Sequence, residues 1–226
     1  MSKNGIDVDA LIEQFAQASA KQGEALRDAV QQATLKALQG RELSAENIRK
    51  VLKTVTQAAS TGAAQNAVGA GAVEGLLGQA FSGMDAALLQ AVEANRKALQ
   101  QFLDQGLGLS EKPLKDALAN VEKMEDVFFA AVTKATQAAG GPMQGPWAHV
   151  LEAMKIKGTD TGALASVTSE QLLAQAQTAL REGRATGARA AKAMLDSYAA
   201  LVSGVLIGMS AGMQAEPEAK KSPRKK

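Results

Sequence analysis

The chain has 226 residues and a formal net charge of +2; 46% of its residues are hydrophobic but only 3% are aromatic, and 46 are alanine. With no cysteine and a single histidine, one chain can form neither a disulfide, nor a thiolate metal site, nor a multi-histidine metal cluster. Because alanine favours helices while burying little area, the composition predicts an all-α protein with long helices and a shallow core.

The excess of basic residues is confined to the C-terminus. Residues 1–215 carry 20 basic and 21 acidic groups, whereas residues 216–226 carry five and two. The sequence has no apolar signal segment at its start and no interior linker rich in proline, serine or charge. We therefore expect an intracellular, cytoplasmic protein with one helical domain over residues 1–215 and a disordered basic tail over residues 216–226.

Two helices with three-four apolar spacing are predicted first along the chain. Asp9 is the expected N-cap of the first, which runs to Gly40. Ser44 opens the second. Residues 62–83 follow, rich in glycine and alanine, and the pattern leaves open whether they form a closely packed helix or the most mobile part of the domain. The inward positions expected in the second helix are Ile48, Val51, Leu52, Val55 and Ala59.

Three further helices are predicted between residues 85 and 162, each between a capping residue and a glycine or proline. The first is expected to begin at Asp85 and to end at Gly106 and Gly108. The second should begin at Ser110 and end at Gly140, Gly141 and Pro142. The third should begin at Gly145 and Pro146 and be followed by a loop from Gly158 to Gly162.

The longest predicted helix runs from Thr168, which begins a capping-box spacing, to about Gln214. No proline interrupts it; small and apolar residues fall on one face, and arginine and lysine on the opposite face. At ~1.5 Å per residue it would extend on the order of 70 Å, more than the width of a compact domain of this size. We therefore expect an elongated helical bundle with a long C-terminal helix, and a homo-oligomer.

Residues 197–215 contain no charged side chain. A helix that is apolar nearly all round must be buried in protein, inserted in lipid or laid on an apolar surface. Small residues recur in it every four positions, a spacing that lets two backbones approach closely. The candidate residues for surface binding or self-association are Ala200, Leu201, Gly204, Val205, Leu206, Ile207, Gly208 and Gly212.

The C-terminal tail is basic and broken by proline. Such a tail can contact phosphates on nucleic acid or on an anionic membrane, or simply remain solvated. It has no aromatic residue that stacks on bases, so we expect no sequence-specific nucleic-acid binding. The basic residues concerned are Lys220, Lys221, Arg224, Lys225 and Lys226.

No arrangement of residues predicts catalysis. His149 and Glu152 form a lone His-x-x-Glu, and one histidine cannot supply a di-iron site, so we expect His149 to be structural or exposed. Glu122, Glu125 and Asp126 lie near lysines, which favours solvated ion pairs. Phosphate-binding and nucleophile-elbow motifs are absent. We therefore expect no catalytic residue, no cofactor, no metal and no enzymatic activity.

The alanine- and glutamine-rich helices, the uncharged stretch within residues 197–215 and the basic tail together resemble those of phasins. Phasins are non-catalytic helical proteins that coat bacterial polyhydroxyalkanoate granules. The resemblance implies that amphipathic helices adsorb onto a hydrophobic surface, either polyester granule or lipid, with their charged faces in water. Residues 38–43 and 85–95 also resemble an uncharacterised family of bacterial helical proteins, and that resemblance implies no function.

Two other functions are compatible with the same residues. One is a soluble, oligomeric scaffold whose last helix self-associates through the row of small residues. The other is a membrane protein anchored by residues 197–215.

Overall fold

The computed structural model describes residues 6–21, 24–39, 44–66, 70–104, 123–139, 141–165 and 167. Its regular elements in these ranges are all helices, with no strand, which confirms the all-α prediction. Residues 160–165 are also helical. In chain order the elements are α1 (Val8–Ala20), α2 (Ala25–Leu38), α3 (Ala45–Asn66), α4 (Ala70–Asp104), α6 (Met124–Ala139), the 3-10 turn η1 (Gly141–Met143) and α7 (Gln144–Lys157).

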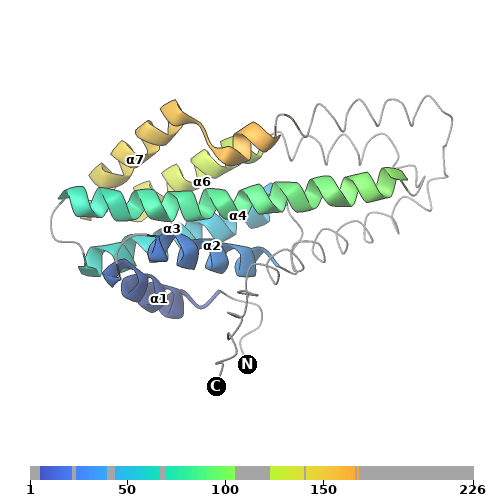
Figure 1. Cartoon of the computed structure of the whole chain (residues 1–226). Coiled ribbons are helices and arrows are strands. Elements are labelled where there is room, and N and C mark those ends of the chain that lie inside the picture. The colour runs from blue at the N-terminus through green and yellow to red at the C-terminus, as the bar shows by residue number, and fades with distance from the viewer. Residues whose placement is uncertain are drawn as a thin grey trace, which may run out of the picture.

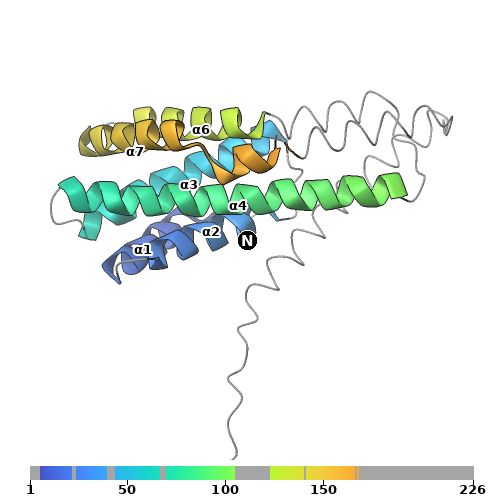
Figure 2. The same cartoon turned by 45° about the horizontal axis from the view of Figure 1, so that its top comes forward.

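The helices pack in three layers, with α3 and α4 in the middle (Figures 1 and 2). On one side α1 packs on α3 and α2 packs on α4; on the other, α6 packs on α3 and α7 packs on α4. The longest described helix, α4, has 35 residues. At ~1.5 Å per residue it extends about 52 Å; it contacts α2 on one side and α7 on the other, and its C-terminal part projects beyond the other described helices (Figures 1 and 2).

Alanine is the most frequent buried hydrophobic residue of the described part, and four large aromatic side chains are buried beside it. Phe15, Phe81, Phe128 and Trp147 are buried, and the rings of Phe81 and Phe128 stack with centroids 4.5 Å apart. Trp147 Nε1 donates to Ser60 Oγ at 2.8 Å, which satisfies the indole inside the core. These four buried aromatic residues therefore lie where the layers meet.

Two glycines allow the helices to approach closely. A Cβ on Gly62 in α3 would lie 2.9 Å from the Phe15 Cβ in α1. A Cβ on Gly83 in α4 would overlap the Arg27 carbonyl oxygen in α2. No atom lies within 4 Å of a Cβ built on Gly71 or Gly75. The described part of the stretch 62–83 is thus helical: it comprises the end of α3 and the start of α4, and from Leu77 onward α4 contributes buried residues to the core.

Helical periodicity predicted α3 well. Ser44 Oγ accepts from the Asn47 backbone N–H at 3.4 Å just before the helix begins, and the five inward positions predicted from the sequence are all buried. The helix expected from Gly145 and Pro146 is α7, in which Trp147 and Val150 are buried.

The first predicted helix is wrong in two respects. It is two helices, α1 and α2, and the sequence between them contains Gly23, which weakens a helix. The N-cap is Asp7, whose carboxylate accepts from the Ala10 backbone N–H at 3.1 Å, and Asp9 lies in the first turn. Aspartate is a favoured N-cap residue, and both aspartates precede the apolar positions of the helix, so the sequence did not show which of them is the cap.

Asp85 is also wrongly predicted as an N-cap of its own helix. The helix that contains it, α4, already begins at Ala70, within the glycine-rich stretch. Asp85 therefore lies in the interior of that helix, and its side chain is buried. The loop expected from Gly158 to Gly162 is shorter than predicted, since residues 160–165 are helical. Gly106, Gly108, Ser110, the predicted helix 168–214 and the tail lie outside the described residues.

Replacing Gly62 by alanine should lower the free energy of unfolding by about 1–3 kcal/mol, because the added methyl forces α1 and α3 apart. The matched control, Gly75→Ala, adds the same methyl to an open helical position and should raise stability by up to about 1 kcal/mol. Urea unfolding followed by circular dichroism measures both. Equal effects of the two substitutions would contradict the close approach of α1 to α3.

Candidate functional site

The candidate residues from the sequence lie outside the part of the chain that the structure describes. This holds for the surface-binding or self-association set, Ala200, Leu201, Gly204, Val205, Leu206, Ile207, Gly208 and Gly212, and for the basic set, Lys220, Lys221, Arg224, Lys225 and Lys226. The described residues contain three features of their own: a groove, a hydrogen-bonded turn and a pair formed by the histidine.

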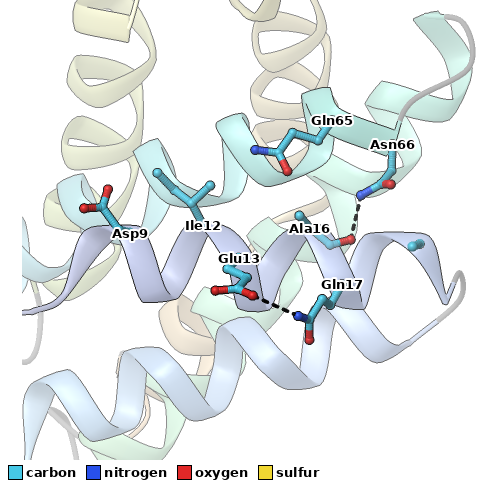
Figure 3. A pocket seen from close by; sticks show the side chains of 8 residues that line it. Asp9, Ile12, Glu13, Ala16, Gln17, Gln65 and Asn66 are labelled. Atoms are coloured by element: carbon cyan, nitrogen blue, oxygen red, sulfur yellow. Dashed lines mark hydrogen bonds between the residues drawn. The ribbon is translucent and has the colours of Figure 1, made fainter.

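The groove lies between α1 and the C-terminal end of α3 and has a volume of about 570 Å³ (Figure 3). Its lining follows one stripe of α1, at the three-four spacing that places residues on a common helix face. Across it, the Asn66 side chain donates to the Ala16 carbonyl oxygen at 2.6 Å and so ties the two helices together. The lining residues are Asp9, Ile12, Glu13, Ala16, Gln17, Ala20, Gln65 and Asn66.

Charge in the groove is of one sign. Asp9 and Glu13 are exposed carboxylates one helical turn apart, and α1 contains no basic residue. Ile12 and Ala16 are half-buried and form an apolar strip beside the acids. Glu13 accepts from Gln17 Nε2 at 3.4 Å. Carboxylates beside an apolar strip suit a lysine or arginine, whose stem packs on carbon while its head pairs with oxygen.

The hydrogen-bonded turn follows α7. Asp85 in α4 accepts from the backbone N–H groups of Asp160 and Thr161, at 3.0 and 3.2 Å. Thr161 Oγ1 donates to the Asp85 carbonyl oxygen at 2.9 Å. The N-cap of the helical turn 160–165 is Thr159, whose Oγ1 accepts from the Gly162 backbone N–H at 3.0 Å, and Asp85 supplements it from another helix by accepting from two further N–H groups of the first turn.

Glu125 in α6 holds the same turn from the other side. Its Oε1 accepts from Thr159 Oγ1 at 2.6 Å and from the Thr159 backbone N–H at 3.2 Å. A Cβ on Gly162 would collide with this carboxylate, so a larger residue there would require the Glu125 side chain to move. Glu125 is therefore half-buried and hydrogen-bonded to a turn, in place of the solvated ion pair predicted from the sequence. Glu122 lies outside the described residues.

His149 forms a pair between α7 and α4. Its Nδ1 lies 2.9 Å from Glu74 Oε1, and its side chain is 70% exposed, as predicted. The hydrogen bond to Glu74, with the charge of that carboxylate, raises the pKa of His149 above its ordinary value. No group of three or more metal-ligating side chains occurs among the described residues.

Few large apolar side chains are exposed on the described surface. The large exposed ones are Val8, Ile156 and Val167, and Ile156 is the most exposed at 84%. A small number of exposed hydrophobic residues is normal on a folded protein. Within the helices that the structure describes, none is both long and apolar enough to cross a membrane.

The sequence contained partial signals for these features. Two acids four residues apart on a helix without basic residues indicate an acidic face, but only the fold places Gln65 and Asn66 opposite it. The run Thr159, Asp160, Thr161, Gly162 has the composition of a helix start, yet its capping carboxylate is 75 residues away in sequence.

Comparison with known proteins relates the chain to one family. The model described as "Family of unknown function (DUF6781)" matches residues 1–215. The match includes all the described helices and the uncharged residues 197–215, and it ends before the basic tail. Neither the curated proteins nor the solved structures contain a match.

Replacing Asp85 by alanine should lower the free energy of unfolding by about 1–3 kcal/mol, because it leaves two backbone N–H groups without their acceptor. Amide exchange at Asp160 and Thr161 should also accelerate. Glu152→Ala, on the exposed face of α7, is the control and should change neither quantity. Unchanged exchange at both amides in the Asp85 variant would exclude this capping.

The pair between His149 and Glu74 should be visible by NMR without assignment, since the chain has one histidine. The His149 midpoint should lie above about 6.5, and Glu74→Gln should lower it. At a pH below the unfolded-state pKa of His149, the pair makes its full contribution to stability. This contribution is lost as the pH rises through the raised pKa of His149 in the folded state. Identical midpoints in both proteins would show that the pair does not form.

Proposed function

The chain belongs to DUF6781, a family of unknown function, and we propose that it is a non-enzymatic, phasin-like protein that attaches to a hydrophobic surface through residues 197–215. The surface is a polyester granule or lipid. The observation that carries the proposal is that the described helices bury their apolar faces against one another, while residues 197–215 contain no charge.

The described helices support attachment by a separate segment. Leu26, Val51 and Leu88, from three different helices, are all fully buried, and few large hydrophobic residues of the described part are exposed. Adsorption through these helices would require the bundle to open and lose that burial. Residues 197–215 incur no charge-desolvation cost on an apolar surface, because they carry no charged side chain.

In this mechanism two contributions add. Apolar side chains of residues 197–215 leave water on the surface, which stabilises attachment by about 0.8 kcal/mol per buried CH₂. Each lysine or arginine of the tail adds about 1 kcal/mol when the surface is anionic. The folded bundle stays on the aqueous side and forms a coat over the granule or lipid surface.

A charge placed in the segment tests the proposal. Ile207→Asp should reduce co-flotation of the full chain with phospholipid vesicles, and its co-sedimentation with polyester granules, at least about ten-fold. Ile156→Asp is the matched control, since Ile156 is the most exposed large hydrophobic residue of the described part, and it should leave attachment unchanged. Wild-type protein that binds neither surface, or loss of binding only in the Ile156 variant, would refute the proposal.

Carbonate extraction of the bound protein separates adsorption from insertion. An adsorbed protein is released, as we propose. Retention in the pellet would instead favour a membrane protein anchored by residues 197–215.

A second candidate is a soluble oligomeric scaffold. It is favoured by the use of Gly62 and Gly83 for close contact between described helices, since Gly204, Gly208 and Gly212 repeat small residues at a spacing suited to the same contact. This scaffold would be a stable oligomer without lipid. Gly208→Leu should convert it to a smaller species in analytical ultracentrifugation, and an unchanged mass would exclude that packing.

A further inference from the structure

The groove between α1 and α3 has an acidic lining, and its most suitable occupant is a basic segment. We propose that this groove binds the basic tail of its own chain, residues 220–226. Those seven residues carry five positive charges and no acid, whereas Asp9 and Glu13 are exposed acids on a helix without basic residues. The two surfaces are therefore complementary in charge.

The spacing of the charges also fits. Asp9 and Glu13 are separated by four residues of helix, about 6 Å along its axis. Arg224 and Lys226 lie two residues apart, which is about 6.6 Å in an extended segment, with both side chains on one side. Their stems would lie on Ile12 and Ala16, and the heads would reach the carboxylates.

The connection is long enough. Fifty-two residues separate Val167 from Lys220. Even as continuous helix they would extend about 78 Å, compared with about 52 Å for the whole of α4. Exposed ion pairs are individually weak, but attachment to the same chain gives the tail a local concentration near the millimolar range. The contact is thus intramolecular and sensitive to salt.

Disulfide trapping in the full chain tests this contact, because the protein has no cysteine of its own. The test pair is Gln17→Cys, at the rim of the groove, with Ser222→Cys in the tail. The control pair is Ala153→Cys with Ser222→Cys, since Ala153 is exposed on α7, on the opposite side of the bundle from α1 (Figures 1 and 2).

At low salt the test pair should form an intramolecular disulfide at least about five-fold faster than the control pair. The advantage should disappear in concentrated sodium chloride and in the Asp9→Asn, Glu13→Gln background. Glu46→Gln with Glu152→Gln removes the same charge from exposed positions elsewhere and should leave it intact. Equal rates for the two pairs overturn the proposal, and so does a disulfide that forms only between chains.

Binding of the tail to the groove would also regulate attachment, and this consequence rests on the proposed function. Asp9→Asn with Glu13→Gln should increase binding to anionic phospholipid vesicles several-fold, whereas Glu46→Gln with Glu152→Gln should not. Disulfide trapping is done without any surface, so failure of the vesicle measurement alone counts against attachment, while failure of trapping counts against the groove.

Discussion

The close approach of neighbouring helices is the constraint on which the bundle depends. Side chains as short as alanine bury useful area only when two backbones lie near each other. Gly62 lets the α3 backbone lie close to Phe15 in α1, and Gly83 lets the α4 backbone lie close to the backbone of Arg27 in α2. Phe81, Phe128 and the other buried aromatic side chains then fill the space between the layers, and the apolar faces of the described helices are occupied by one another.

Because those faces are occupied, an external hydrophobic surface has to be met by other residues, and this leads to the proposed role of residues 197–215. The turn after α7 is fixed by two different helices. Asp85 in α4 and Glu125 in α6 bind Thr159, Asp160 and Thr161, and the helical turn that follows remains packed on the core through Ala165. The acidic groove, on the other side of the bundle, is where we propose that the basic tail binds when the protein is not attached to a surface.

Features that depend on residues near in sequence were predictable. Three-four spacing gave α3 and its buried positions, from Ile48 to Ala59, because burial there follows helix geometry alone. Features that join distant segments were not. Asp85 has the residue type of a cap but serves a turn 75 residues away, and the reversal between α1 and α2 interrupts a periodicity that continues in the sequence.

Hydrogen exchange of the full chain, measured free and bound to vesicles or granules, tests the central claim most directly. A closed bundle with a separate attachment segment should keep the amide protection of α3 and α4, while residues 197–215 gain protection on the surface. The contradicting result is loss of protection in α3 and α4 with no gain in residues 197–215. It would mean that the bundle opens and spreads its own apolar faces on the surface.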